Sequence, residues 1–417
     1  MLLESLNEHF QASQGEGGLT AFRKKGWQRF TEIGLPSKSV DAFRYVPLRE
    51  LYSSSFKKTA PPNIDKSLLL KSILPECAHS HIVFIDGFFI PELSDISALP
   101  PSTLLTSFED ALATHGSFLQ SYLTRALKEE KDPFALLNLA LHSQGAFFYL
   151  PPKLETVAPL QCLYVMTGEG AQLIAPRLHL VLGAFSGMDC IFTTVQLGES
   201  SHLIIPDTQI SLEEGASLNL YNILHTRAAW HFETLRAALK KNARFDSLNV
   251  NVGGKAVRHS YRVQLQGENS EANLNGLWML EGSSTAHTHV LIEHEAPRTR
   301  SLQKFKGVLN DHSQSSFEGK IWVASEAQKT EAYQLNHNLL LSQGAIARAK
   351  PNLEIFADDV KASHGATISQ LDDAQLFYLN TRGIEKSAAK ELLIDGFCRE
   401  MIEKIPYDVL LRKLVIT

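Results

Sequence analysis

The sequence has few cysteines, and none of them forms a recognisable metal or disulfide motif. Its 417 residues contain four cysteines, with no C-x-x-C pair among them. A secreted disulfide scaffold would use more cysteines at closer spacing, and a structural zinc site or a permanently held four-cysteine cluster would show paired ligands. We therefore expect inert, partly buried thiols at Cys77, Cys162, Cys190 and Cys398.

Long apolar runs and strong net charge are also missing. No uninterrupted apolar segment approaches the ~20 residues needed to cross a bilayer, and Glu4 and Glu8 interrupt the first residues in a way that a secretory signal would not. The net charge is −5, with acidic and basic residues intermixed. We therefore expect a soluble cytoplasmic protein with neither a nucleic-acid partner nor an anionic-membrane partner.

Three common catalytic motifs are absent. The nearest approach to a phosphate-binding loop is Gly254-Lys255, but Ala256 follows it and Asn249 stands where the first glycine belongs. No G-x-S-x-G stretch could present a serine nucleophile. His294-Glu295 starts like a zinc-protease motif, but a proline follows two residues later and no second histidine completes it.

The chain divides into three regions that differ in their pattern of apolar and polar residues. Residues 1–145 mix helical periodicity with loops, and helices are predicted at Leu119–Glu129 and Phe134–Leu141. Residues 146–365 alternate apolar and polar residues in short segments separated by glycines, which predicts many short strands. The clearest of these strands are Leu218–Leu224, Phe245–Val252, Ser260–Leu265 and Thr288–Ile292. We find no strict residue repeat, so a sandwich, a barrel and a β-solenoid all remain open.

Residues 366–417 are predicted to be helical again. Asp372 and Asp373 suit the start of a helix, because their negative charge complements the partial positive charge of its N-terminus. Gly383 ends this helix, and a second one begins near Ser387 and is closed by Pro406.

Two histidine-containing segments are candidate metal sites. His287 and His289 would share one face of a strand, whereas His294 would point the other way unless a turn intervenes. Two imidazoles alone do not define a metal site, and solvent-facing or hydrogen-bonded histidines would give the same pattern. The segment Ala357–Thr367 (ADDVKASHGAT) contains His364 among hard oxygen ligands, with a structural turn as the alternative interpretation.

Several blocks of sequence resemble the SufB/SufD family of iron–sulfur cluster assembly proteins. They are spread over residues 34–400 and are densest after residue 294. The blocks are Gly34–Lys38, Phe43–Leu48, His294–Pro297, Gln303–Gly307, Phe317–Ile321, Gln328–Ser342, Lys350–Thr367 and Leu376–Ile384. Within the family, the run Ser363-His-Gly-Ala-Thr is similar to SufD chains rather than to SufB chains, which are longer and richer in cysteine.

This resemblance implies a fold and a set of partners. The implied fold is mainly β: a right-handed parallel β-helix core, flanked by helical N-terminal and C-terminal domains. Stacked short strands would bury a continuous interior, each coil contacting only its neighbours. The resemblance further implies a non-catalytic scaffold subunit of the SufBCD complex that pairs with a SufB-like subunit through the β-helix. Its C-terminal helical domain, residues 366–417, would bind the SufC ATPase.

Site residues follow from the same resemblance. His364 matches the family histidine at the SufB interface, where it would help to acquire iron or hold a cluster. Relatives often have a cysteine two residues earlier, but this chain has Ala362. We therefore expect no cofactor bound stably by the isolated chain, only iron or an Fe–S cluster held transiently at the interface. Candidate SufC contacts, which could equally pack the helical pair together, are Asp373, Phe377, Tyr378, Arg382 and Gly383.

Two other functions stay open. The chain could be a SufB-like paralogue that nucleates the cluster itself, although clusters are held chiefly by cysteine thiolates. It could also be a β-helix polysaccharide lyase or hydrolase, for which Asp358 and Asp359 are the only visible carboxylate pair. The isolated chain could form a homodimer through the surface that meets the related subunit.

Overall fold

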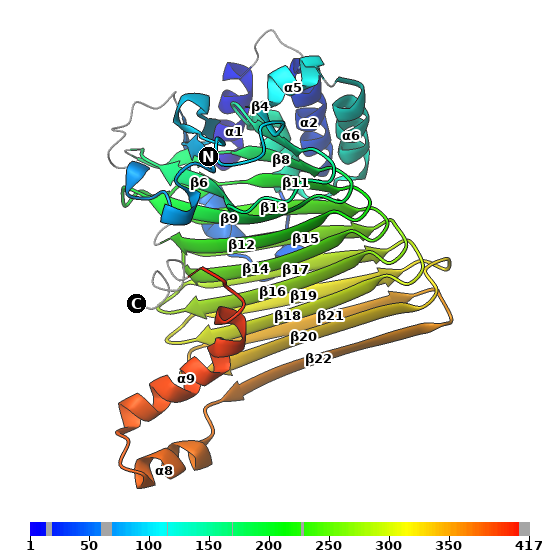
Figure 1. Cartoon of the computed structure of the whole chain (residues 1–417). Coiled ribbons are helices and arrows are strands. Elements are labelled where there is room, and N and C mark those ends of the chain that lie inside the picture. Colours follow the sequence, from blue (N-terminus) through cyan, green and yellow to red (C-terminus); the bar gives the residue numbers. More distant parts are fainter. Residues whose placement is uncertain (14–18, 60–68, 115, 169, 227–228, 408–417) are drawn as a thin grey trace.

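The core of the protein is a parallel β-solenoid of about eight turns, in which two sheets face each other (Figure 1). The computed structural model describes residues 1–407 apart from 14–18, 60–68, 115, 169 and 227–228. The chain alternates between the sheets, so strands of one turn pair in parallel with strands of the next. The mainly β fold with a parallel solenoid core, predicted from the family resemblance, is confirmed.

Sheet A, as we name the first sheet, contains β4 (Leu104–Ser107), β5 (Ala146–Leu150), β8 (Arg177–Leu182), β11 (Asp207–Leu212), β13 (Trp230–Leu239), β15 (Ala256–Leu265), β17 (Thr285–His294), β19 (Gln314–Val323) and β21 (Ile346–Ile355). The short strands β1 (Lys57–Lys58), β7 (Gln172–Ile174) and β10 (Leu203–Ile204) join it at one side. Sheet B contains β2 (His81–Ile85), β3 (Phe88–Phe89), β6 (Leu160–Met166), β9 (Gly187–Gln196), β12 (Ser217–Thr226), β14 (Arg244–Gly253), β16 (Glu271–Leu280), β18 (Arg300–Leu309), β20 (Thr330–Leu340) and β22 (Val360–Gln370). All four strands predicted from alternation lie inside β12, β14, β15 and β17.

The main hydrophobic core lies between the two sheets. Side chains alternate along each strand, and the inward positions include Phe245 on β14 and Phe305 on β18, both fully buried. Phe305 contacts Phe317 of the opposite sheet, with ring centroids 5.0 Å apart. Because each turn supplies only a few such residues, the core is continuous only while turns stack on one another.

A left-handed corner recurs in successive turns where the chain passes from sheet A to sheet B. The residue at this corner has positive φ, and its backbone N–H donates to a carbonyl of the following turn, as from Asn242 to Glu268 (2.9 Å) and from Arg298 to Gln328 (2.8 Å). The corner positions are Lys153, Phe185, Gly215, Asn242, Asn269, Arg298 and Lys329. The repeat is therefore one of conformation and not of residue type.

Helices and antiparallel strands close the first end of the solenoid. The antiparallel strands β3 and β4 terminate the two sheets there. The helices are α1 (Leu2–Ala12), α2 (Thr20–Ile33), α3 (Leu48–Ser53), α5 (Phe108–Thr114), α6 (Gly116–Glu129) and α7 (Pro133–Leu141), with short 3₁₀ helices at Asp41–Phe43, Pro75–Cys77 and Pro91–Leu93. All nine residues of α7 are buried, and Asp132 caps it by accepting from the Phe134 N–H (3.0 Å). Both helices predicted in this region are confirmed.

The last two helices leave the other end of the solenoid. Helix α8 (Asp373–Thr381) is capped by Asp372, which accepts from the Ala374 N–H (2.8 Å), and it ends before Gly383, whose φ is 85°. Helix α9 (Lys386–Ile402) returns along the outer face of sheet B, where Cys398 and Met401 are buried. Figure 1 shows α8 and the start of α9 projecting beyond β22. Residues 408–417 of the expected C-terminal domain lie outside the described residues.

The boundaries expected at residues 145 and 365 do not coincide with breaks in the sheets. Strands β1, β2, β3 and β4 belong to residues 1–145, yet they pair within sheets A and B. Strand β22 continues to Gln370, five residues beyond the second boundary. The N-terminal region and the solenoid therefore share hydrogen-bonded sheets.

The corner conformation gives a stability prediction. Lys329 is exposed and has a φ of 62°, a region that costs a residue with a side chain roughly 1 kcal/mol and costs glycine almost nothing. Lys329→Gly should therefore raise the free energy of unfolding by about 0.5–1 kcal/mol, and Lys329→Val should lower it by about 1–2 kcal/mol. Urea unfolding followed by circular dichroism measures both.

Lys361, exposed on strand β22 without positive φ, is the matched control. There the change to glycine should lower the free energy of unfolding, because glycine loses more backbone freedom in a strand. Destabilisation of equal size by glycine at both positions would contradict the account of the corner.

Candidate functional site

His364 lies on β22, the last strand of sheet B, at a position that faces the interior of the solenoid. Its register partner on β20 is Gln334, which is fully buried. His364 itself is exposed, because no further turn covers β22 within the described residues. Ala362 precedes it on the same face, so this stretch offers one imidazole and no thiolate to a metal ion.

The end of the solenoid around His364 is open. Asn336 and Asn338 on β20 are 1% exposed, whereas on β22 the paired inward positions, Ala366 and Ile368, are exposed. Ile368 is 48% exposed, and Phe356, just before β22, is 62% exposed. The outer edge of β22 pairs with no other strand in the described part of the chain. Such an edge combines unpaired backbone groups with uncovered apolar side chains, which proteins normally cover.

The α8–α9 hairpin presents its aromatic residues to solvent. Phe377 is 71% exposed and Tyr378 is 56% exposed, while Leu376 is the residue of α8 that is buried. The Arg382 guanidinium lies 5.2 Å from the centre of the Tyr378 ring. The structure thus places the predicted contact residues, including Asp373 at the start of α8 and Gly383 after its end, together on one projecting hairpin. Exposed aromatics beside an arginine are typical of protein-binding surfaces.

His287 and His289 lie together on the outer face of β17, as predicted, and His294 faces inward. The segment Asp41–Tyr45 covers the first two: Ala42 and Tyr45 line the same small cavity as these histidines. Burial, and then the charges of Arg258 and Arg348, lower the pKa of His287 to about 3. Its Nδ1 lies 2.7 Å from Ser316 Oγ. Across the described residues, no group of three or more His, Cys, Asp or Glu side chains is arranged to hold a metal ion, so this pair lacks a third ligand there.

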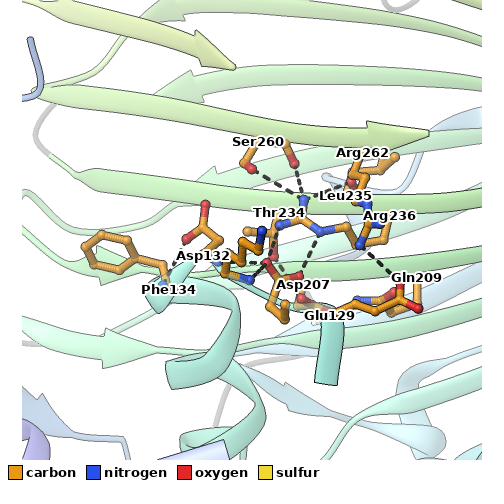
Figure 2. Close-up of polar contacts among 12 residues, drawn as sticks. Glu129, Asp132, Phe134, Asp207, Gln209, Thr234, Leu235, Arg236, Ser260 and Arg262 are labelled. Atoms are coloured by element: carbon orange, nitrogen blue, oxygen red, sulfur yellow. Dashed lines mark hydrogen bonds and ion pairs between the residues drawn. The ribbon is translucent and has the colours of Figure 1, made fainter. Parts of the chain in front are cut away.

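An ion-pair network fixes the N-terminal helices onto sheet A, and no local sequence pattern signals it. Figure 2 shows Arg236 and its neighbours along the strands of the sheet, beside the helical ribbon that carries Phe134. Arg236 donates to both carboxylate oxygens of Glu130, at 2.9 and 3.0 Å. Burial lowers the pKa of the Arg236 guanidinium, but the Glu130 carboxylate outweighs this effect and the net pKa is raised. Arg258 pairs with Asp132 at 2.7 Å, with both side chains almost fully buried.

A cleft of about 280 Å³ lies beside this network, between segment 40–43, residues 129–132 and the strands β13, β15 and β17. Its cationic residues, Lys131, Arg236, Arg258 and Arg262, are matched in number by carboxylates, and the three arginines form ion pairs with them. The cleft therefore has no surplus charge for an ionic ligand, and its polar groups serve to hold the N-terminal region in place.

A second polar cluster lies inside the solenoid. Glu233 accepts hydrogen bonds from Asn222 (2.9 Å) and from His259 Nδ1 (2.8 Å). Burial would raise the pKa of Glu233, but hydrogen bonds from His231 and His259 outweigh it and hold the pKa at about 2. His294 lies next to the corner at Arg298. Its two ring nitrogens lie 2.7 Å from Thr299 Oγ1 and 2.9 Å from Ser301 Oγ. Burial lowers the pKa of His294 to about 3.

Two family models match the chain. Residues 164–397 match the SufBD core domain of the SUF system for FeS cluster assembly, and residues 5–162 match the SufBD protein N-terminal region. The chain belongs to the SufBD family. The N-terminal match includes the N-terminal helices and the first strands of both sheets, and the core match includes the remaining turns of the solenoid.

Relatives of the SufBD family span almost the whole chain. An iron–sulfur cluster assembly SufBD family protein of Synechocystis sp. is 30% identical, covering 97% of this chain and 91% of its own length. Iron–sulfur cluster assembly protein SufD of Escherichia coli is also 30% identical, with 91% and 87% covered. The chloroplastic protein ABCI7 of Arabidopsis thaliana is 27% identical, with 97% and 86% covered. No helix in the described part of the chain is long and apolar enough to span a membrane.

The buried histidines predict that the protein loses stability in mild acid. A histidine whose pKa is lowered in the folded state binds fewer protons there than in the unfolded chain, so the free energy of unfolding falls as the pH falls from about 6.5 towards about 3. Between pH 7 and pH 5, His294 should contribute a loss of about 2 kcal/mol. Urea unfolding at the two pH values measures the loss.

His294→Gln keeps a polar side chain but removes the titration, so its loss between pH 7 and pH 5 should be about 2 kcal/mol smaller than that of the unchanged protein. Exposed His225→Gln is the control and should show the full loss. An identical pH dependence for His294→Gln and the unchanged protein would contradict this role of His294.

Proposed function

We propose that this chain is a non-enzymatic scaffold subunit of iron–sulfur cluster assembly that pairs with a related, SufB-type solenoid through its open end. The observation that carries the proposal is the uncovered last turn, where inward-facing positions and the outer edge of β22 are left without a neighbour in the described chain. A second solenoid ending in the same way has the shape and the backbone groups to cover it.

The arrangement of potential metal ligands supports a transient role. His364 lies at the open end, and the described residues contain no group of three or more His, Cys, Asp or Glu side chains that could hold a metal ion. Iron or a nascent cluster, as cargo, would therefore take most of its ligands from the partner subunit. If His364 supplies a ligand to the cargo, this chain takes part in delivering iron. If it does not, the chain only shapes the interface.

The cysteines favour this scaffold over a subunit that nucleates clusters by itself. All four are buried, and burial raises the pKa of Cys77 to about 12 and that of Cys398 to about 11. A protonated thiol is a poor metal ligand, since clusters bind thiolates. A polysaccharide-cleaving enzyme has even less support, because Asp358 and Asp359 are adjacent residues before β22, and Glu130, Asp132 and Glu293 of the cleft beside Arg236 form ion pairs with arginines.

We further propose that the α8–α9 hairpin binds the SufC ATPase. The hairpin is anchored at one side only: Lys306 on sheet B donates to the Phe397 carbonyl (2.8 Å) and pairs with Glu400 (2.9 Å). Its other side carries Phe377 and Tyr378 into solvent. A hairpin held at its base with aromatics at its tip could transmit movement of an ATPase to the nearby open end. A cytoplasmic location remains a prediction.

Two variants should distinguish the proposed SufB-type surface from the proposed SufC surface. Ile368→Asp places a charge at the open end and should weaken binding of the SufB-type subunit of the same organism at least tenfold, with SufC binding retained. The pair Phe377→Ala and Tyr378→Ala should weaken SufC binding by roughly 30-fold, about 2 kcal/mol, with the SufB-type subunit retained. Co-expression, size-exclusion chromatography and subunit quantification measure both.

Val157→Asp is the matched control, because Val157 is fully exposed and lies in the loop between β5 and β6, far from β22 in the stacking order. It should leave the complex intact. If Ile368→Asp leaves binding of the SufB-type subunit unchanged, the proposed interface is wrong. A homodimer of the isolated chain that dissociates with Ile368→Asp would show that the same end also pairs with its own copy.

A further inference from the structure

A small cavity lies on the outer face of sheet A, where residues of β17, β19 and β21 form its floor and the segment Asp41–Tyr45 covers it. Its volume is about 60 Å³. One water molecule needs at least about 10–15 Å³ of such space, so the cavity has room for about four to six water-sized groups. The side chains that line it indicate what it can hold.

Three polar side chains lie side by side across the floor of this cavity. His287 on β17 is in register with Ser316 on β19, and Ser316 is in register with Arg348 on β21. All three line the cavity. Neighbouring strands are about 4.8 Å apart, so the backbones of the first and the third residue are separated by roughly 10 Å. Ser316 lies between them.

One ring nitrogen of His287 has no hydrogen-bond partner. Its Nδ1 lies 2.7 Å from Ser316 Oγ, whereas Nε2 is buried and has no partner within the described structure. The residue is 3% exposed, so bulk water does not satisfy this nitrogen. A buried polar atom without a partner costs free energy, and a ligand that pairs with Nε2 in the cavity would remove this cost.

The charged residues around the cavity leave one positive charge unmatched. Asp41 and Glu318 are its two carboxylates, and both pair with Lys350. Asp41 also pairs with Arg44 at 2.6 Å. The third cation, Arg348, forms no ion pair with a carboxylate among the described residues. Unlike the larger cleft beside the N-terminal helices, this cavity therefore has a surplus of positive charge.

Two contacts hold the Arg348 guanidinium in place. Its Cζ lies 4.5 Å from the centre of the Tyr45 ring, and its Nη1 donates to Gln314 Oε1 at 3.2 Å. A guanidinium has five N–H donors, so several remain for another partner. Its planar arrangement of donors matches the oxygens of carboxylates and phosphates, and it also stacks on aromatic rings.

We propose that this cavity binds one tetrahedral oxyanion of the phosphate or sulfate type between His287 and Arg348. Ser316 donates its hydroxyl hydrogen to His287 Nδ1, so the ring proton lies on Nε2, and this N–H donates to the anion. Arg348 donates from the opposite side and supplies the opposite charge. An oxyanion together with hydrogen bonds to donors on both sides spans roughly 8 Å, which fits the separation of the two strands.

The proposed anion site does not depend on the proposed function. Its residues lie on the outer face of sheet A, whereas the surfaces proposed for the SufB-type subunit and for SufC lie on β22 and on the α8–α9 hairpin. A bound anion would connect the segment Asp41–Tyr45 to β21, the last strand of sheet A.

Isothermal titration calorimetry of the full-length chain with sodium sulfate tests the proposal, at neutral pH and constant ionic strength. The unchanged protein should bind one sulfate with a dissociation constant on the order of 1 mM. Inorganic phosphate should bind with similar affinity, and acetate, with two oxygens, more weakly. Arg348→Met keeps an unbranched side chain over Tyr45 but loses the charge and the donors, so sulfate binding should weaken at least tenfold.

Lys320→Met is the matched control, because it removes one positive charge from the same outer face of sheet A. Lys320 pairs with Glu354 at 2.6 Å and does not line the cavity. Its variant should bind sulfate as the unchanged protein does. His287→Phe keeps a ring in the cavity wall but removes the N–H donor, and it should weaken binding at least fivefold. Circular dichroism establishes that each variant is folded.

Protein labelled with ¹⁵N-histidine shows where the anion binds. The Nε2 signal of His287, assigned by its loss in His287→Phe, should shift with the same dissociation constant as the calorimetric titration. The signals of exposed His225 should not shift. The proposal is overturned if sulfate does not bind at tens of millimolar, if Arg348→Met binds it as tightly as the unchanged protein, or if binding leaves the His287 signals unchanged.

Discussion

A parallel β-solenoid satisfies the backbone of each turn only through the turns on either side. Every strand from β5 to β20 has a hydrogen-bonded neighbour on both edges. The apolar side chains that point inward from these strands are buried. The two end turns cannot be satisfied in the same way. At the first end, antiparallel strands pair with the edges of the two sheets. Helices cover this end as well, and the buried ion pair between Arg258 and Asp132 holds them in place. At the last end nothing in the described chain does so.

The functional features of the protein follow from that asymmetry. The cleft beside Arg236 is balanced in charge and holds the N-terminal region in place, so it is part of the closed end. His364, exposed Ile368 and the α8–α9 hairpin all belong to the open end. A buried layer of amides lies on β20, one turn away from the open end. Such a buried polar layer fixes a hydrogen-bonding pattern in the turn next to the open end, at some cost in stability.

Much of the fold was predictable from the sequence, and the reasons for the failures are physical. Alternation of apolar and polar residues identified strands such as β12 and β14, and capping residues such as Asp372 located α8. The solenoid could not be distinguished from a sandwich by repeats, because the corners require a left-handed backbone that Asn242, Arg298 and Lys329 adopt alike. Only the family resemblance resolved that ambiguity. Strands β2 and β4 lie before residue 145, and they pair with β6 and β5, which follow in the sequence.

The candidate site was predicted less completely. His364 and the exposed aromatics of α8 were identified by resemblance, and the structure adds that they lie at an uncovered end. The pairing of Asp132 with Arg258 joins residues that are 126 positions apart, and no local pattern signals it. No local pattern signals that residues 41–45 cover His287 either. Gln334 was visible as part of a motif, but its alignment with Gln303 and His364 depends on the register of β18, β20 and β22, which only the structure supplies.

The measurement that tests the central claim most directly is hydrogen exchange along β22 with and without the SufB-type subunit. Alternate amides of this strand point away from β20 and have no acceptor within the described chain. The account predicts that these amides exchange quickly in the isolated chain and become protected in the complex, while α7 exchanges at the same rate in both. Binding of the subunit with no change in exchange along Val360–Gln370 would contradict the claim that the open end is the interface.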